Sequence, residues 1–545
     1  MGVGRLDPAE RRRSLDRIRG GTVDVVVVGG GVVGAGAALD AASRGLTVAL
    51  LEKDDWASGT SSRSSRLAHG GLRYLEQREF GLVHEALTER GLLLERLAPH
   101  LVRPVPFVFP LTRAVDRPYV GAGIAIYDVL ARVGRSTGGL PGHRHLSRKA
   151  TARLAPGLRD DAFTGAIGFF DAQIDDARHT VALVRTAATH GALTVSRANV
   201  TGFLRTDERV TGVAVSDLES GESFTVSARV VIGATGVWSQ QTRDLVRGVV
   251  SDTVADGSSD DVQSMRPSKG VHLVVDRDAI AMNAALIART AHSVLFLLPW
   301  GRHWLVGTTD TAWDGALEDP QPTDADVDYL LAEANRWLAR PLTRADVTGS
   351  FAGLRPLLTL DGHDTDRPDT TKLSREHAVS SPLPGFVDVA GGKYTTYRVM
   401  ARDVVDEAVR QLPEAMRPGP SRTQALPLVG AHGYAGLWRR RHQIAADRGL
   451  PVSAVVHLLR RHGDQYEDVL DLVAADASLA GLLHLDAPYW RAEVVHGVLA
   501  EGARTVTDVL HRRTRLAVEV ADAGGPSVVD DVRALMISAG AAPPD

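Results

Sequence analysis

A strand, a glycine-rich turn, a helix and a second strand follow one another near the N-terminus, and this unit constrains the fold most. From Thr22 the sequence reads TVDVVVVGGGVVGAGAALDAASRGLTVALLEKDD. Gly29, Gly31 and Gly34 have the G-x-G-x-x-G spacing, which permits a tight turn, close approach of a pyrophosphate and packing of helix on strand. Glu52 closes the second strand, where an acid can accept hydrogen bonds from a ribose hydroxyl. The unit predicts an α/β fold whose parallel sheet binds a dinucleotide at these four residues.

Glu52 also restricts which dinucleotide binds. An acid at this position argues against the 2′-phosphate of NADP, which leaves FAD and NAD. The chain carries one such glycine fingerprint, whereas an enzyme with two dinucleotides should show a second phosphate-binding turn. The alternative is a Gly-rich turn in an unrelated α/β sheet. The pattern favours a single bound dinucleotide.

Composition excludes several classes of protein. With 545 residues, the chain is long enough for several domains. Its net charge of −4 lacks the basicity of a nucleic-acid-binding protein, and without cysteine it has no disulfides, thiolate metal ligands or cysteine nucleophile. No secretory signal is recognisable, and no stretch reaches the roughly 18 apolar residues that span a bilayer. We expect a cytoplasmic protein that acts on small molecules, with no nucleic-acid partner.

Changes in residue pattern divide the chain into domains. Alternating apolar and polar residues before residue 236 predict antiparallel strands that return to the parallel sheet. Further strand-like pieces between polar turns indicate a second, antiparallel domain, and short helical patterns dominate the C-terminal part. The expected parts are an N-terminal extension (1–21), a discontinuous Rossmann-like dinucleotide-binding domain (22–251 and 345–412), an antiparallel-sheet substrate domain (252–344) and an all-α C-terminal domain (418–545).

Two small-residue segments could contact the nucleotide. The loop GTSSRSSRLAHGGLRYLE, residues 59–76, offers hydroxyls and backbone amides for phosphate and ring contacts, and Thr60, Ser61 and Ser62 are its candidates. Ala234, Thr235 and Gly236 end a predicted strand where it would meet a cofactor. The alternatives are a polar surface loop and an ordinary turn.

Several motifs in one order carry a family resemblance. GGGVVGAGAALDAASRG, TSSRSSRLAHGGLRYLE, PW with GTTD, GLRP and GGKYTTYR occur as in the FAD-dependent, aerobic-type glycerol-3-phosphate dehydrogenases. The chain resembles this family from about Thr22 to the C-terminal helices. The resemblance implies FAD as cofactor, sn-glycerol 3-phosphate as substrate and a quinone as electron acceptor at the membrane. Arg66 stands where the family often has lysine; its guanidinium could face outward or approach the pyrophosphate.

The resemblance also implies roles for individual residues. Arg73, Tyr74, Arg355 and Lys393 correspond to substrate contacts, and the three cations follow glycines from which they can reach a phosphate. The alternative is that they form surface salt bridges. In the same way, the family places Gly391, Gly392 and Thr395 at the pyrimidine edge of the flavin.

Oxidation of a secondary alcohol also needs a base near flavin N5, because the hydroxyl loses a proton as the C2 hydride leaves. His69 and His272 are the candidates, and either could instead be a structural hydrogen-bonding residue. Arg355 could stabilise the negative charge of an alkoxide or of reduced flavin. We expect these three residues to be catalytic.

Other features favour structural roles. Asp175 and Asp176 are interpreted as a helix cap and a solvated charge. No group of residues has convincing metal-ligand spacing, so we expect no metal. Residues 117–135, RPYVGAGIAIYDVLARVGR, suit either a helix lying in a membrane interface or a buried core helix. The chain is compatible with a homodimer and with peripheral attachment to the inner face of the cytoplasmic membrane.

Three functions compete with a quinone-reducing dehydrogenase. An oxidase of similar fold would share the substrate site and pass electrons to O2, producing hydrogen peroxide. A non-catalytic flavoprotein would hold FAD as a redox sensor. An amine or amino-acid oxidase would not need three cations that suit a phosphate.

Overall fold

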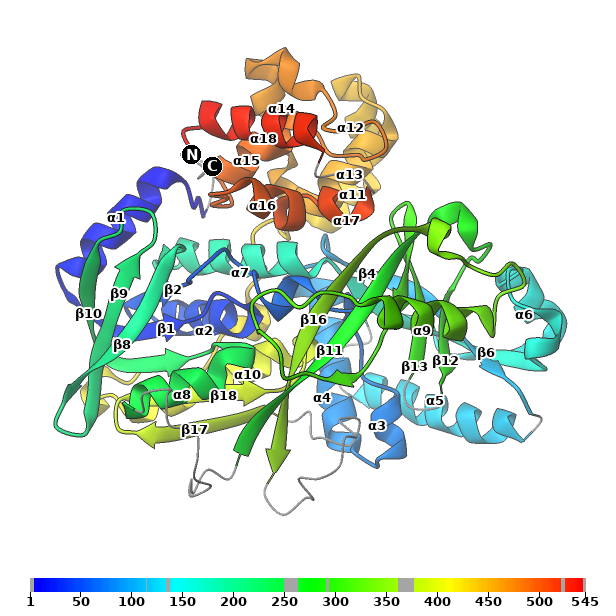
Figure 1. The fold of residues 1–545 in the computed structure, drawn as a ribbon, viewed down its shortest axis with the longest axis horizontal. Helices are drawn as coiled ribbons and strands as arrows, with labels where there is room; N and C mark the ends of the chain where they lie inside the picture. The colour runs from blue at the N-terminus through cyan, green and yellow to red at the C-terminus, as the bar shows by residue number, and fades with distance from the viewer. Residues whose placement is uncertain are drawn as a thin grey trace.

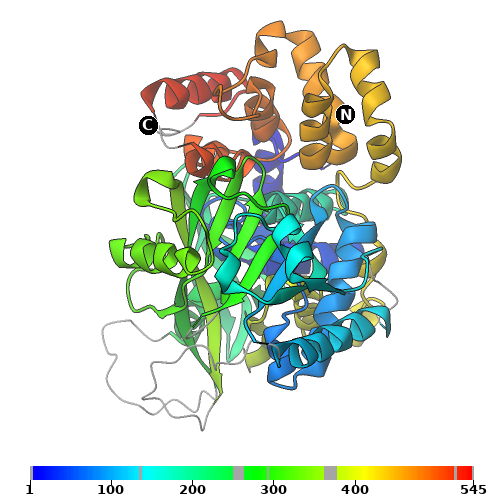
Figure 2. The ribbon, with the colours of Figure 1, turned by 90° about the vertical axis from the view of Figure 1, so that its right-hand side faces the viewer.

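The computed structural model describes residues 4–113, 115–133, 138–248, 263–290, 294–360, 377–520 and 525–542. Two sheets lie side by side, and a bundle of C-terminal helices sits across one end of both (Figure 1). Figure 2, turned by 90°, shows the same bundle above the sheets. The predicted α/β class with a helical C-terminal region is confirmed.

The first sheet contains the predicted nucleotide-binding unit. Its central strands pair in parallel and are valine-rich and buried, because helices cover the sheet. The predicted antiparallel strands are confirmed, since β8 and β9 pair antiparallel and lead into β10. In spatial order the strands are β17 (His377–Leu383), β18 (Phe386–Gly391), β10 (Ser223–Gly233), β1 (Thr22–Val28), β2 (Val48–Leu51) and β7 (Leu193–Val195), with β9 (Arg209–Asp217) and β8 (Ala198–Thr206) attached to β10.

Helices pack against this sheet through their apolar side chains. α2 packs between α7 and α10, and its small side chains allow close contact. The N-terminal extension forms α1, which buries Leu15 and Ile18 against the sheet and pairs Arg11 with Asp217 at 2.6 Å. The helices are α1 (Pro8–Arg19), α2 (Val32–Ser43), α7 (Asp176–Thr189), α8 (Ser239–Arg247) and α10 (Tyr397–Arg410).

The second sheet is mostly antiparallel and draws strands from several parts of the chain. Residues 252–344 supply β11 to β15, but strands from earlier and later segments complete the sheet. Alternating polarity predicts a strand without saying which sheet it joins, so the segment boundaries differ from the sheet boundaries. In order the strands are β15 (Thr311–Ala312), β11 (Gln263–Asp276), β14 (His303–Gly307), β13 (Val294–Trp300), β12 (Ala285–Arg289), β4 (Val102–Leu111), β6 (Gly165–Ile174) and β3 (Leu67–Ala68), with β16 (Val347–Leu360) on β11 and β5 (Arg144–Ser147) on β6.

In the described part of the chain, five helices flank the second sheet. α3, α4 and α5 lie together at the end of the molecule away from the C-terminal bundle (Figure 1). The helices are α3 (Arg73–Glu76), α4 (Phe80–Leu92), α5 (Asp116–Val133), α6 (Arg148–Leu154) and α9 (Asp324–Asn335).

The C-terminal bundle has its own core. Val455, Leu459 and Val532 are completely or almost completely buried in it. Its helices are α11 (Tyr434–Arg439), α12 (Arg441–Arg448), α13 (Val452–His462), α14 (Tyr466–Ala475), α15 (Arg491–Leu499), α16 (Val506–Asp508), α17 (Leu516–Glu519) and α18 (Pro526–Ser538).

Candidate active site

A cavity of about 1030 Å³ lies where the two sheets meet the C-terminal bundle. It brings together most of the residues predicted from sequence. Those that line it are Gly29, Gly31, Glu52, Thr60, Ser61, His69, Tyr74, Ala234, Thr235, Gly236, His272, Arg355, Gly391, Gly392, Lys393 and Thr395. Gly34 and Ser62 lie outside this lining.

The glycine turn packs so closely against neighbouring backbone that side chains would not fit at Gly29 or Gly34. Gly29 has φ of +108°, and a Cβ there would lie 2.6 Å from the Ala234 carbonyl oxygen. A Cβ on Gly34 would overlap the Gly29 carbonyl oxygen. Gly34 therefore allows the helix to pack on the strand and does not line the cavity. Gly31 caps α2, whose N-terminal amides therefore open into the cavity. This geometry suits a pyrophosphate.

Glu52 stands beside this turn. Its carboxylate accepts hydrogen bonds from the backbone amides of Gly30 at 2.6 Å and Asp54 at 2.8 Å. Burial raises the pKa of Glu52 to about 7, although these two bonds act in the opposite direction. A carboxylate so placed is ready to accept further hydrogen bonds from ribose hydroxyls.

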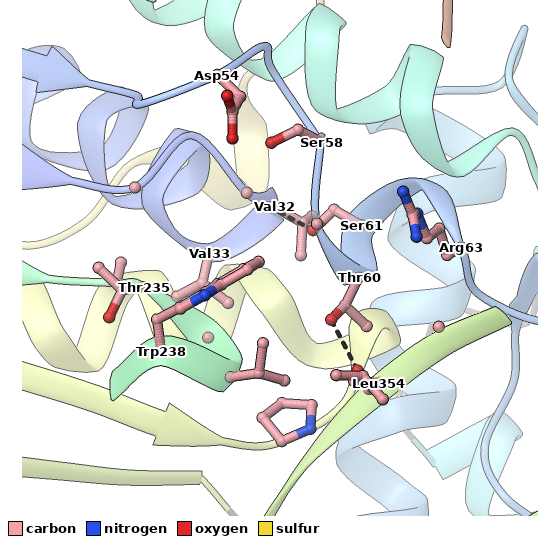
Figure 3. A pocket seen from close by; sticks show the side chains of 18 of the residues that line it. Val32, Val33, Asp54, Ser58, Thr60, Ser61, Arg63, Thr235, Trp238 and Leu354 are labelled. Carbon is pink, nitrogen blue, oxygen red and sulfur yellow. Dashed lines mark hydrogen bonds between the residues drawn. The ribbon is translucent and has the colours of Figure 1, made fainter. Parts of the chain in front are cut away.

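The hydroxyl loop closes over the turn (Figure 3). Ser61 Oγ accepts from the Val32 amide at 2.9 Å, while Thr60 Oγ1 donates to the Leu354 carbonyl at 2.7 Å. The loop thus joins α2 to β16 of the other sheet. Ser62 turns away, and its carbonyl accepts from Arg515 of the C-terminal bundle at 3.1 Å.

His272 lies on β11 and is 2% exposed. Its Nε2 is 2.9 Å from Ser65 Oγ, and its ring stacks on Phe351 at 5.1 Å between centroids. Burial lowers the pKa of His272 to about 3, with additional repulsion from Arg355 and Arg66. The imidazole is therefore neutral at ordinary pH and can accept a proton.

Arg355, on the neighbouring strand β16, faces the same end of the cavity. Its guanidinium donates to Thr308 Oγ1 at 2.8 Å and to the Thr309 carbonyl at 2.9 Å, and lies 3.4 Å from Asp310. These contacts fix the orientation of a cationic fork that lines the cavity.

The loop after β18 completes this end. The Lys393 ammonium lies 3.5 Å from the centroid of the Tyr74 ring, and both residues line the cavity. Thr395 Oγ1 accepts from the His69 backbone amide at 3.1 Å, which ties the two predicted loops together. Arg73 begins α3, but its side chain lies outside the described part of the structure.

Two sequence interpretations are wrong. Asp175 does cap α7, but neither it nor Asp176 is a solvated charge, because both pair with the buried Arg515. Arg66 neither faces outward nor lines the cavity, since it is 1% exposed and its guanidinium lies 3.7 Å from the Trp300 ring centroid. Burial lowers the pKa of Arg66 to about 10. Both interpretations failed because the sequence around a residue does not show which distant segment will bury it.

Residues of the C-terminal bundle also line the cavity, although the sequence did not predict them as site residues. They include Thr505, Asp508 and Arg512. The T-x-x-D pattern at Thr505 signals a helix start, and the structure has the capping box, but nothing local shows that this helix faces a cavity. Ser65, the partner of His272, belongs to the serine-rich loop and could have been a candidate on composition.

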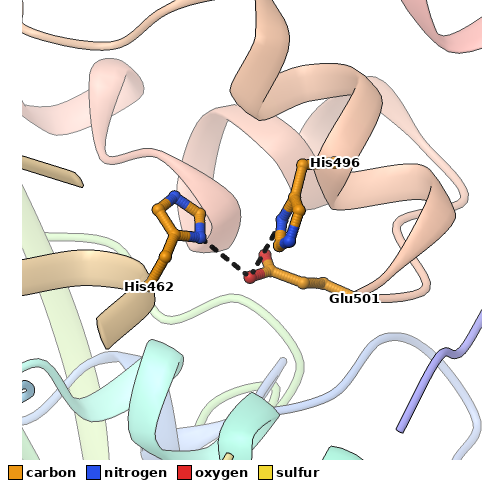
Figure 4. A group of neighbouring side chains, drawn as sticks. All are labelled: His462, His496 and Glu501. Atoms are coloured by element: carbon orange, nitrogen blue, oxygen red, sulfur yellow. Dashed lines mark ion pairs between the residues drawn. The ribbon is translucent and has the colours of Figure 1, made fainter. Parts of the chain in front are cut away.

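A separate group in the C-terminal bundle has metal-ligand types (Figure 4). His462, His496 and Glu501 are buried with ligand atoms within 4.8 Å of one another. However, Arg178 donates to Glu501 at 2.6 Å and its Nη2 lies 3.2 Å from His462 Nδ1. A guanidinium thus already supplies the positive charge, which favours an ion-pair junction over a metal site.

Comparisons with known proteins agree with this geometry. The sequence profile described as "FAD dependent oxidoreductase" matches residues 24–398, and that described as "C-terminal domain of alpha-glycerophosphate oxidase" matches residues 421–539. "Glycerol-3-phosphate dehydrogenase 2" of Mycobacterium tuberculosis is 48% identical over 515 residues, covering 94% of this chain and 84% of the relative. This chain belongs to the FAD-dependent glycerol-3-phosphate dehydrogenase family.

Less similar proteins also match over most of the chain. The mitochondrial glycerol-3-phosphate dehydrogenase of Bos taurus is 36% identical over 97% of this chain and 72% of the relative. The structure of glycerol-3-phosphate dehydrogenase from Bacillus halodurans, complexed with FAD, has a TM-score of 0.76 at 27% identity and covers 98% and 94% of the two chains. L-alpha-glycerophosphate oxidase from Mycoplasma pneumoniae, at 20% identity and a TM-score of 0.53, shares the fold.

FAD is the cofactor of this family, and the cavity fits it. The cavity reaches the turn of Gly29 and Gly31 at the N-terminus of α2, which suits a pyrophosphate, and Glu52 can accept ribose hydroxyls. The cavity continues from there to His272, Arg355 and Lys393. The predicted cofactor is confirmed, and the residues assigned to it remain proposals.

The affinity of the apoprotein for FAD should fall as the pH is lowered from 7 to 5. Ribose hydroxyls that donate to Glu52 favour its ionised form, so binding releases up to one proton and weakens by up to about tenfold per pH unit below 7. FAD fluorescence quenching measures the Kd, and Glu52→Gln should remove the pH dependence. An unchanged pH slope in that variant would contradict the assignment.

The same raised pKa has the opposite effect on stability. Between about pH 4.5 and 7 the folded apoprotein holds a proton on Glu52 that the unfolded chain releases. The contribution of Glu52 to the free energy of unfolding therefore falls as pH rises through this window. FAD affinity and apoprotein stability should respond to pH in opposite directions, which separates binding from unfolding.

Proposed function

We propose that this protein oxidises sn-glycerol 3-phosphate to dihydroxyacetone phosphate. The observation that carries the proposal is that Arg355, Lys393 and His272 line the same cavity as the glycine turn. Two cations suit a phosphate dianion, and a neutral histidine suits removal of a hydroxyl proton. The names of the relatives support the same substrate.

FAD, when bound, supplies the acceptor for the hydride that leaves C2 of the substrate, at flavin N5. His272 accepts the C2 hydroxyl proton at Nε2, the atom that Ser65 Oγ contacts. The lowered pKa means only that the ring is unprotonated before substrate binds, and stacking on Phe351 keeps the ring in place. The alcohol thus loses one hydride and one proton and becomes a ketone.

Arg355 and Lys393 bind and orient the phosphate end. Thr308 and Asp310 hold the Arg355 fork in one orientation, so little rotamer freedom is lost when the substrate binds. The position of Lys393 against the Tyr74 ring limits where its ammonium can point. Arg73 adjoins Tyr74 and is proposed as a third substrate contact. The cations also favour the negative charge that develops on the substrate oxygen.

An anaerobic titration of the holoprotein tests the substrate. We expect sn-glycerol 3-phosphate to bleach the absorbance of oxidised flavin, and glycerol or a 2-hydroxy acid to leave it unchanged, because neither control carries a phosphate. No bleaching by the phosphate ester would overturn the proposal and favour a redox sensor. Bleaching by an amino acid would favour an amino-acid oxidase.

We propose a membrane quinone as the electron acceptor and α5 as the helix that meets the membrane. Among the described residues, no helix is long and apolar enough to cross a bilayer. α5 instead buries Ile124 and Tyr127 and exposes a second apolar face. That face consists of Tyr119 (62% exposed), Ile126 (42%), Val129 (54%) and Val133 (67%).

Basic residues adjoin this apolar face. Arg113 and Arg132 are exposed at the two ends of α5, where they can meet anionic headgroups. α5 lies at the end of the molecule away from the C-terminal bundle (Figure 1). The lack of cysteine in the chain is consistent with the cytoplasmic face of the membrane.

The double variant Ile126→Glu/Val129→Glu should no longer float with anionic phospholipid vesicles. Insertion of the α5 face would bury two carboxylates, which is unfavourable. Turnover with vesicle-embedded quinone should fall about tenfold or more, while anaerobic reduction by substrate stays unchanged. Leu485→Glu, at a residue 89% exposed on the C-terminal bundle, is the control. Unchanged flotation would exclude α5, and faster reoxidation by O2 than by quinone would favour an oxidase.

A further inference from the structure

Asp176, behind the wall of the cavity, contacts the hydroxyl loop of the flavin site. It is the first residue of α7 and has no exposed surface. Its Oδ2 accepts from the backbone amide of Ser64 at 3.1 Å and from Ser64 Oγ at 2.7 Å. Ser64 lines the cavity and precedes Ser65, the partner of His272. Asp176 therefore fixes the loop at the point that meets His272.

The same residue holds the second loop of the site. The Asp176 carbonyl oxygen accepts a hydrogen bond from Tyr394 Oη at 2.7 Å. Tyr394 stands between Lys393 and Thr395, and both neighbours line the cavity. Two loops more than 300 residues apart in the chain, as the 326-residue separation of His69 and Thr395 shows, thus meet one buried aspartate.

The charge of Asp176 is balanced by the C-terminal bundle. Arg515 forms an ion pair with Asp176 and a second one with Asp175 at 3.3 Å. Arg515 also donates to the Ser62 carbonyl of the hydroxyl loop at 3.1 Å. Arg515 is 3% exposed, so water does not substitute for these contacts. Burial alone would raise the pKa of Asp175, but Arg515 and Arg461 outweigh it and lower the pKa to about 2.

We propose that the Asp176–Arg515 pair is a positioning device, through which the C-terminal bundle holds both loops of the flavin site in register with His272 and Lys393. Neither residue lines the cavity, so neither is a catalytic residue. Removing Arg515 leaves the buried Asp176 without this counter-ion, whereas removing the Asp176 charge leaves Arg515 paired with Asp175 alone. In both cases we expect the loops to shift to relieve the imbalance. Displacements of about 1 Å can slow a reaction by about a hundredfold.

Asp176→Asn and Arg515→Met test the inference, with Arg515→Lys as the milder variant that retains the charge. Glu89→Gln is the matched control: it breaks an equally buried pair in which Arg398 donates to Glu89 at 2.6 and 2.8 Å, and neither control residue lines the cavity. Each holoprotein is measured for melting temperature, FAD Kd, and the limiting rate and half-saturation of anaerobic flavin reduction by glycerol 3-phosphate.

We expect Asp176→Asn and Arg515→Met each to lower the limiting reduction rate about tenfold or more, with Arg515→Lys between them and the native protein. The double variant should resemble Arg515→Met, because that variant already lacks the Asp176–Arg515 pair together with the contacts of Arg515 to Asp175 and Ser62. Glu89→Gln should lower the melting temperature and leave the rate and the FAD Kd within twofold.

The inference would be overturned if the Asp176 and Arg515 variants had limiting reduction rates and FAD Kd values within twofold of those of the native protein. If Arg515→Met does not fold, Arg515→Lys decides by the same criterion. The inference rests on the proposed function only because glycerol 3-phosphate is used to reduce the flavin in the assay. Failure of glycerol 3-phosphate to bleach the native flavin contradicts the proposed function, whereas normal bleaching in all variants contradicts only the positioning role.

Discussion

Replacing His272 by asparagine should lower the limiting rate of flavin reduction by about 10²- to 10⁴-fold while FAD remains bound, the range found for loss of a general base. The native ring is neutral because burial lowers its pKa to about 3. Asparagine keeps polarity at this position but cannot take a proton at pH 7. Anaerobic stopped-flow absorbance measures the rate, and added imidazole should restore part of it.

The pH profile of the native reduction rate gives a second test of His272. Because the pKa of His272 lies near 3, its protonation produces no inflection near pH 6.5 in the native reduction rate. His100→Asn is the matched control, since His100 is also buried with its pKa lowered mainly by burial, but it lies outside the cavity lining. A His272→Asn rate within threefold of native would transfer the role of base to His69.

Replacing Arg355 by methionine should lower kcat/KM for glycerol 3-phosphate by about 10²- to 10³-fold, as expected for about 3–4 kcal/mol lost with a buried charge-assisted contact. The loss has two parts. The substrate phosphate loses a guanidinium fork, and Asp310, which is 4% exposed, loses its ion pair. Steady-state kinetics with a quinone acceptor measures the effect.

Arg355→Lys and a phosphate-binding assay distinguish these parts. Lysine restores the charge opposite Asp310 without the fork, so it should recover only part of kcat/KM. Inorganic phosphate should perturb the flavin spectrum of the native protein but not that of Arg355→Met. Arg340→Met is the control, because Arg340 is exposed elsewhere in the molecule, and it should respond like the native protein. Equal phosphate affinity in Arg355→Met would remove Arg355 from the phosphate site.

Local patterns predict the nucleotide half of the site well. The turn from Gly29 to Gly34 and the acid at Glu52 lie within one strand–helix–strand unit, so their geometry follows from backbone rules that short segments obey. The first sheet, with its parallel centre and returning antiparallel strands, is predictable for the same reason. By contrast, no local pattern places β4 in the second sheet, where it pairs with β12 on one side and β6 on the other.

The substrate half and the domain junctions depend on long-range packing. His272 and Arg355 came from family resemblance and chemical type, and only the paired strands β11 and β16 place them at one end of a cavity. Asp176 has the local pattern of a helix start in solvent, yet Arg515 covers it. Charge patterns along a chain describe which residues could pair, not which are buried together.

The ion pairs between the C-terminal bundle and the flavin site have a consequence for how the chain is made. Asp55 is buried and depends on Arg512 and Arg513, whose guanidinium groups hold its pKa below the usual range against the effect of burial. Arg512 follows Asp55 by 457 residues. A ribosome therefore releases the whole nucleotide-binding sheet before the arginines that neutralise its acids exist. We expect the site to mature only once the C-terminal bundle has left the ribosome, because Arg512 and Arg513 can neutralise Asp55 only then.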